Sequence, residues 1–156
     1  MSARKKARTP PGMVDVGDKA VTRRIARAEA IVRLPREVLD CASGDDIQSR
    51  KGPVFHTAIL AGIMAAKKNH ELIPLCHPIG IENCQVAIRF NAKKEAVIDC
   101  RVETHDRTGV EMEALTGAAV AALTVYDMCK GLSHGIVIKS IRLLEKSGGR
   151  HNYSGR

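Results

Sequence analysis

The feature that most constrains the fold is the order in which two hydrophobic periods follow each other along the chain. Alternation of apolar and polar residues with a period of two is typical of strands, whereas apolar residues spaced three and four apart are typical of helices. The patterns predict strands over residues 26–34, 85–90, 96–104 and 135–146, long helices over 54–69 and 109–130, and a short helix over 35–41.

With the short helix set aside, the predicted order is strand, helix, strand, strand, helix, strand. This is the split β-α-β-β-α-β arrangement. It predicts an α+β protein with a ferredoxin-like two-layer sandwich, in which an antiparallel sheet carries its helices on one face. A chain of 156 residues suffices for one hydrophobic core. We therefore expect one domain over residues 13–156, preceded by a flexible basic tail over residues 1–12.

Apolar runs and cysteine content exclude several classes of protein. The longest uncharged apolar run, residues 58–66, has nine residues, far fewer than the roughly 20 that span a bilayer. The first dozen residues lack the apolar segment of a secretory signal. The five cysteines are odd in number and form no C-x-x-C pair, which indicates reduced thiols. We expect a cytoplasmic protein without membrane association.

The chain is basic, with a net charge of +8. A positive charge favours nucleic acid, an anionic surface or a small phosphorylated molecule as partner. A sheet that binds single-stranded RNA stacks bases on aromatic rings, but Phe90 is the only ring in the predicted strands. A non-catalytic nucleotide- or RNA-binding module on a ferredoxin-like sheet therefore remains the alternative, and a nucleic-acid partner is not the expectation.

Four short clusters combine residue types that carry chemistry. The clusters are residues 50–53 (RKGP), 74–78 (PLCHP), 108–113 (TGVEME) and 126–130 (YDMCK). Each also has a purely structural interpretation. In the same order, these are a solvated turn, a rigid buried connection, acids that complement a helix dipole, and a surface ion pair.

The last two clusters lie at opposite ends of the predicted helix over residues 109–130. Asp127 and Lys130 are three residues apart and so are neighbours on one helix face. Glu113 and Asp127 are separated by roughly 21 Å along the helix axis at about 1.5 Å per residue. They share a face but are too far apart to share a small ligand. If both act on one molecule, two subunits must supply them.

Lysines near glycine-rich turns indicate a ligand rich in phosphate. Lys51, Lys130, Lys139 and Lys146 are of this kind, and Lys146 is followed closely by Gly148 and Gly149. Backbone amides exposed by glycine bind phosphate oxygens. A P-loop is excluded because no G-x-x-x-x-G-K-[ST] motif occurs.

A metal site is the third interpretation. Cys76 and His77, with Cys84 or His105, are the residue types that bind zinc, but no pair has the spacing of a zinc finger. We therefore expect no metal ligands.

The clusters together resemble the MoaC family of cyclic pyranopterin monophosphate synthases. The resemblance covers residues 13 to about 150, and its two longest motifs are specific. The matching segments, in the family's order, are MVDV (13–16), KG (51–52), AGI (61–63), LIPLCHP (72–78), TGVEMEALT (108–116), YDMCK (126–130) and KSGG (146–149).

The resemblance implies a phosphorus-oxygen lyase of molybdenum cofactor (molybdopterin) biosynthesis. Such an enzyme converts 3′,8-cyclo-7,8-dihydro-GTP, a nucleotide-derived small molecule, to cyclic pyranopterin monophosphate with release of pyrophosphate. The family's fold is ferredoxin-like. The resemblance also implies a homohexamer, arranged as a trimer of dimers with active sites at subunit interfaces.

The resemblance assigns roles residue by residue. Catalytic roles fall on Asp127, Lys51 and Lys130, and substrate-binding roles fall on Leu75, Cys76, His77, Met112, Glu113 and Lys146. No resident cofactor is implied, although Mg²⁺ accompanying the triphosphate remains open. Two residues depart from the family's pattern, Pro53 after Gly52 and Ile59 in the following helix, and both lie near Lys51.

Overall fold

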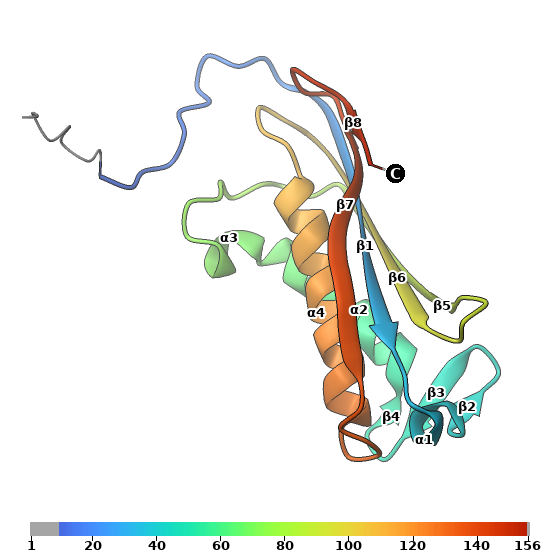
Figure 1. Ribbon diagram of the computed structural model, residues 1–156. Helices are drawn as coiled ribbons and strands as arrows, with labels where there is room; N and C mark the ends of the chain where they lie inside the picture. Colours follow the sequence, from blue (N-terminus) through green and yellow to red (C-terminus); the bar gives the residue numbers. More distant parts are fainter. Residues whose placement is uncertain (1–9, 156) are drawn as a thin grey trace, which may run out of the picture.

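The computed structural model describes residues 10–155. Figure 1 shows one sheet with two long helices beside it. Residues 1–9 of the predicted tail lie outside the described residues. The elements are β1 (Thr22–Arg33), α1 (Arg36–Leu39), β2 (Ala42–Ser43), β3 (Asp46–Ser49), β4 (Gly52–Pro53), α2 (Val54–Lys67), α3 (Asn69–Leu72), β5 (Asn83–Phe90), β6 (Ala96–Asp106), α4 (Glu111–Cys129), β7 (Val137–Ser147) and β8 (Tyr153–Ser154).

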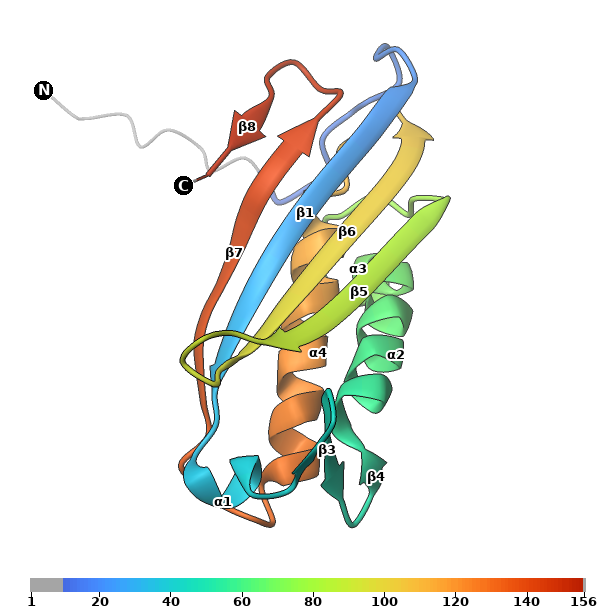
Figure 2. The same ribbon diagram turned by 90° about the vertical axis from the view of Figure 1, so that its right-hand side faces the viewer.

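The main sheet confirms the predicted topology. Its strand order is β5-β6-β1-β7-β8, and every pair is antiparallel. With β8 set aside, this is the order that a split β-α-β-β-α-β chain adopts. Helices α2 and α4 cover one face, and the opposite face is turned toward the viewer in Figure 2. The protein is therefore a two-layer α+β sandwich of ferredoxin-like form.

The core between sheet and helices is built from small residues. Ala26, Ala28, Ala30 and Val32 of β1 are fully buried, as the period-two alternation predicts. Their small side chains let α4 pack close to the sheet, with α2 beside it. The two helices nearly touch at Gly62, where a methyl group would lie 2.8 Å from a backbone oxygen of α4. Alanine and glycine therefore set the short distance between the layers.

The opposite face of the sheet carries paired charges. Arg27 donates to Asp99 across β1 and β6 at 2.7 Å, and Glu29 accepts from Arg142 of β7 at 3.0 Å. Such cross-strand pairs stabilise a sheet modestly. They explain why Arg27 and Glu29 occupy two of the alternating positions on this face of β1.

A small second sheet, β2-β3-β4, was not predicted. Its strands have two to four residues, too few to show a period. The buried carboxylate of Asp46 in β3 accepts hydrogen bonds from the backbone amides of Phe55 and His56 at 2.6 and 3.2 Å. These are free amides of the first turn of α2, where the N-cap residue Pro53 makes no side-chain cap. Asp46 thus caps α2 from outside the helix.

Between residues 10 and 155, no helix is long and apolar enough to cross a membrane.

Candidate active site

Helix α4 carries predicted site residues at both of its ends. Its first turn contains Glu113 and lies beside the turn that follows β7 (Figure 1). Its last turn contains Asp127 and lies beside the hairpin of β3 and β4. The structure therefore divides the predicted residues into two groups, here called the triad (Lys51, Asp127, Lys130) and the cavity group (Leu75, Cys76, His77, Met112, Glu113, Lys146).

The triad is a carboxylate held between two ammonium groups. Lys51 Nζ lies 2.6 Å from Asp127 Oδ2, and Lys130 Nζ lies 2.8 Å from Asp127 Oδ1. Lys130 and then Lys51 lower the pKa of Asp127 to about 2, and Asp127 in turn raises the pKa of Lys130. All three side chains are about half exposed. The triad therefore offers solvent one anion and two cations, all charged at neutral pH.

Local backbone geometry carries Lys51 to the end of α4. Lys51 sits in the turn between β3 and β4, where Gly52 adopts a φ of +109° that suits glycine. Ser49 Oγ accepts from the Lys51 amide and donates to the Gly52 carbonyl, both at 3.1 Å. This short hairpin explains how residues 76 positions apart in the chain form an ion pair.

The cavity group surrounds the N-terminal end of α4. A cavity of about 390 Å³ is lined by five of the six predicted substrate-binding residues: Leu75, Cys76, His77, Met112 and Glu113. Val14, Val16 and Lys19 of the segment before β1 line it as well. The proline-bracketed loop and the first turn of α4 thus form one concave surface.

Glu113 is an unusual member of this surface because its carboxyl group is buried. Its side chain accepts a hydrogen bond from Asn69 Nδ2 at 2.9 Å. Burial raises the pKa of Glu113, and the bond from Asn69 opposes that rise. Only 3% of Glu113 is exposed, although the residue lines the cavity.

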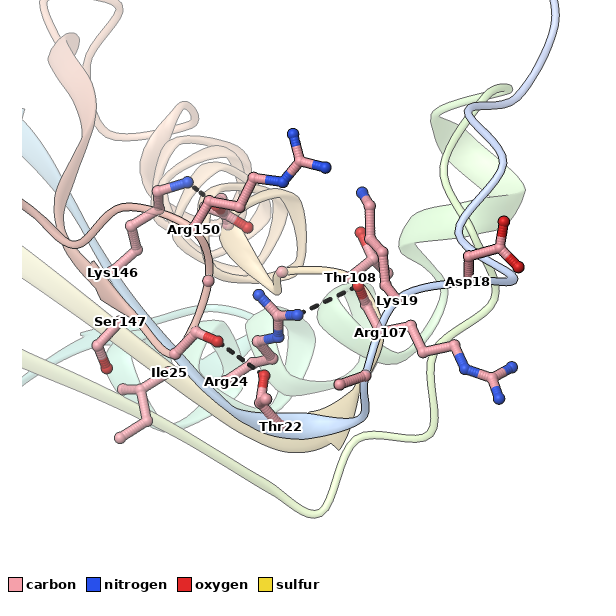
Figure 3. Close-up of a pocket in the computed structure, with 15 residues that line it drawn as sticks. Asp18, Lys19, Thr22, Arg24, Ile25, Arg107, Thr108, Lys146, Ser147 and Arg150 are labelled. Carbon is pink, nitrogen blue, oxygen red and sulfur yellow. Dashed lines mark hydrogen bonds and ion pairs between the residues drawn. The ribbon is translucent and has the colours of Figure 1, made fainter.

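A second cavity of about 560 Å³ adjoins the first and is strongly basic. It holds Lys146, whose Nζ lies 2.7 Å from Glu111 Oε1. The two cavities share Lys19, Thr108, Gly109 and Glu111, so they form one continuous site. Figure 3 shows the basic side chains around the second cavity, and they come from four separate segments: Lys19, Arg24, Arg107, Lys146 and Arg150.

Four of these basic residues were not singled out from the sequence. Lys19, Arg24, Arg107 and Arg150 belong to no motif. Arg24 donates to the carbonyls of Asp106 and Arg107, each at 3.2 Å, and so ties the loop before α4 to β1. No sequence pattern marks these four residues as part of a site. The one sequence feature that pointed to this cavity is the pair of glycines, Gly148 and Gly149, after Lys146.

The glycine pair closes the basic cavity. Gly148 has a φ of +88°, and a methyl group there would overlap the Arg23 carbonyl of β1. Its own carbonyl accepts from Thr22 Oγ1 at 2.7 Å (Figure 3). The turn after β7 therefore needs glycine in order to seat against β1.

Other residues considered from the sequence have different surroundings. Lys139 pairs with Glu95 at 2.7 Å. His105 Nδ1 lies 2.9 Å from Glu82, and in the described part of the chain no group of three metal-ligand side chains could hold an ion.

Pro53 and Ile59 line a separate cavity of about 500 Å³. The ring of Phe90 packs on Phe55 of α2, with centroids 5.1 Å apart, and so serves the core.

The family model described as "MoaC family" matches residues 13–149. The chain belongs to the MoaC family. A protein of Xanthomonas axonopodis pv. citri named cyclic pyranopterin monophosphate synthase is 51% identical over 142 residues, which cover 91% of this chain and 86% of that protein.

Two longer proteins match the same MoaC region. The molybdenum cofactor biosynthesis bifunctional protein of Synechocystis sp. is 47% identical over 148 residues, covering 92% of this chain and 43% of that protein. Molybdenum cofactor biosynthesis protein 1 of Dictyostelium discoideum is 45% identical over 156 residues, covering 90% of this chain and 25% of that protein. A MoaC unit therefore also occurs as part of larger chains.

Proposed function

We propose that this MoaC-family chain is a cyclic pyranopterin monophosphate synthase. It converts 3′,8-cyclo-7,8-dihydro-GTP to cyclic pyranopterin monophosphate and releases pyrophosphate. The observation that carries the proposal is the continuous site at the start of α4, where five cations surround a cavity next to a buried carboxyl group. Binding of a triphosphate needs the cations, and the buried carboxyl group serves proton transfer to a heterocycle.

The cationic cavity is suited to the triphosphate and to the departing pyrophosphate. Lys146, Arg24 and Lys19 supply positive charge, and the first turn of α4 adds its partial positive charge. Charge placed in advance where anionic charge develops stabilises a transition state. The smaller cavity, lined by His77 and Met112, then receives the purine-derived part of the substrate.

The triad supplies a second set of proton-transfer groups. Asp127 stays ionised because two ammonium groups hold its pKa low, so it accepts a proton only when the substrate displaces a lysine. Lys130, whose pKa is raised by Asp127, is a proton reservoir at the same place. Lys51 supplies the second positive charge beside the Asp127 carboxylate. We assign the acid and base steps of ring opening and closure to this group together with Glu113.

If the triad and the cavity group act on one substrate molecule, two chains must supply them. Asp127 of the triad and Glu113 of the cavity group lie at opposite ends of α4, about 21 Å apart along its axis. We propose that one subunit supplies the triad and another supplies the cavity group, in a homohexamer arranged as a trimer of dimers. Apolar side chains exposed on the helix layer support assembly, among them Leu60, Met64 and Leu123.

We further propose that the enzyme is cytoplasmic and works without a resident cofactor, with Mg²⁺ entering, if at all, with the triphosphate. The pairing of Glu111 with Lys146 at 2.7 Å supports the proposal of no resident metal cofactor, because a carboxylate held by an ammonium group is a poorer ligand for a metal ion.

The test is a turnover assay with purified protein and freshly generated 3′,8-cyclo-7,8-dihydro-GTP. Pyrophosphate and the cyclic pterin phosphate are quantified together. Asp127→Asn should lower turnover by about 10²-fold or more, the usual effect of losing an acid–base group. Asp40→Asn is the matched control, because within residues 10–155 the exposed Asp40 side chain forms one ion pair, with Arg36 at 3.9 Å, at the end of α1. Normal turnover by Asp127→Asn, or none by the wild type, would overturn the assignment.

A further inference from the structure

Behind the cavity wall lies a set of three hydrogen-bonded, buried polar side chains, of which the proposed reaction uses only Glu113. Asn69 is 1% exposed and stands at the start of α3, next to the end of α2. Its Nδ2 donates to Glu113 Oε1 at 2.9 Å, and its Oδ1 accepts from Thr116 Oγ1 at 2.7 Å. The three side chains form a line from the interior of the helix layer to the cavity.

An ionised Glu113 carboxylate, which can only accept, fixes which way the Asn69 amide faces, and the Thr116 hydroxyl completes the pairing. A threonine hydroxyl inside a helix ordinarily donates to the carbonyl four residues earlier. Thr116 donates instead to Asn69 Oδ1, so the amide oxygen is occupied and the amide nitrogen faces Glu113. Rotation of the amide by 180° would set two oxygens against each other. The Glu113 carboxylate therefore sets the orientation, and the bond from Thr116 satisfies the amide oxygen in that orientation.

A set of hydrogen-bonded polar side chains in the core lowers the free energy of unfolding unless every polar group has a partner. Asn69, Glu113 and Thr116 are all buried, and among the described residues no buried side-chain nitrogen or oxygen lacks a partner. An apolar trio would fill the same space without polar groups to satisfy. Placement directly behind a carboxyl group that lines the cavity points to a role in the chemistry of that group.

We infer that Asn69, held by Thr116, is a positioning residue that fixes the Glu113 carboxyl group at the cavity wall for proton exchange with the substrate. This inference rests on the proposed function. Asn69 itself lies outside the residues that line the cavity, so it acts through Glu113.

The effect on protonation has a definite sign. Burial raises the pKa of Glu113, and the bond from Asn69 favours the charged form and limits that rise. Loss of the bond should therefore raise this pKa further. Glu111 on α4 and His70 on α3 lie close enough to Glu113 to affect its charge, and Lys19, Cys76 and His77 line the same cavity.

The experiment measures the Glu113 pKa directly in the intact protein. Carbon-13 NMR of protein labelled at glutamate carboxyls follows the Glu113 signal, which is assigned by its disappearance in Glu113→Gln. Asn69→Leu, which keeps the side-chain shape, should raise the pKa by about one unit, the usual worth of one hydrogen bond to a charged group. Thr116→Val should raise it by a smaller amount. Thr116→Ser keeps the hydroxyl and should retain the wild-type pKa.

Turnover gives the second readout. The limb of the pH profile of kcat/KM that reports Glu113 should move to higher pH in Asn69→Leu by the same amount as the pKa. In a Glu113→Gln background, Asn69→Leu should cause no further loss, because its effect runs through Glu113. An unchanged Glu113 pKa in folded Asn69→Leu, or equal losses in both backgrounds, would overturn the inference. If Asn69→Leu does not fold, the Thr116→Val and Thr116→Ser pair decides by the same criterion.

The two proposals fail in different ways. Absence of pyrophosphate release by the wild type refutes the proposed function and leaves the NMR result to stand alone. Normal release together with a Glu113 pKa that ignores Asn69 and Thr116 refutes only the positioning role.

Discussion

Replacement of Gly148 by alanine tests how the basic cavity is closed. The added methyl group faces two penalties, because the residue has a φ of +88° and because the methyl overlaps the Arg23 carbonyl. The positive φ costs about 1–2 kcal/mol for a residue with a Cβ. Overpacking against backbone costs about 1–3 kcal/mol more. Displacement of the turn also breaks the bond from Thr22, worth about 1 kcal/mol.

These contributions predict a loss of about 3–6 kcal/mol in the free energy of unfolding of Gly148→Ala. For a chain of this length the loss corresponds to a fall in Tm of roughly 10–20 °C. Because the same turn carries Lys146, Ser147 and Gly149 into the cavity, pyrophosphate should also bind more weakly.

Gly44→Ala is the matched control. Gly44 also has a positive φ, +60°, but a methyl group there meets no atom within 4 Å. Gly44→Ala should therefore lose only the free energy of backbone strain, about 1–2 kcal/mol, and its affinity for pyrophosphate should be unchanged. Urea unfolding and calorimetric titration with pyrophosphate measure both quantities. Equal destabilisation by the two substitutions would refute the claim that the turn after β7 seats against β1.

Three further outcomes are expected. In Lys130→Met the pKa of Asp127 should rise more than in Lys51→Met, because Lys130 contributes most to lowering it, and carboxyl NMR titration distinguishes the two. Asp46→Asn should destabilise the protein at pH 7 by about 2 kcal/mol through loss of charge-assisted bonds to the start of α2, as measured by urea unfolding. Since the pKa of Asp46 is lowered from 3.8 in the folded state, this stabilisation is present above the unfolded value and is lost as the pH falls through the folded one, so wild type and Asp46→Asn should converge in acid.

The long elements were predictable because their periods extend over many residues. Alternation in β1 and the apolar positions of α2 and α4 gave the sandwich topology, with ends that differ by a few residues. The first strand begins at Thr22 rather than near Ala26, because its register with β6 continues through Arg23 and Arg24. The strands β2, β3 and β4 escaped prediction because two to four residues carry no period.

Prediction of the site had a similar limit. Contiguous motifs singled out the segments that hold Leu75, His77 and Glu113, and these segments line one cavity. Arg24 and Arg150 were missed because they meet only after β1 and the turn following β7 have paired. Asn69 was missed for the same reason, because its function depends on a partner 44 positions away.

The central claim is that one active site combines the two ends of α4 from different subunits, and subunit mixing tests it most directly. Glu113→Gln and Asp127→Asn are each expected to be nearly inactive alone. When the two variants are unfolded, mixed in equal amounts and refolded together, a site has its Glu113 and its Asp127 intact with a probability of about one quarter, given symmetric assembly. The account therefore predicts pyrophosphate release at about a quarter of the wild-type rate. If mass spectrometry shows mixed oligomers and their activity equals the average of the separate variants, both groups act within one chain and the account is wrong.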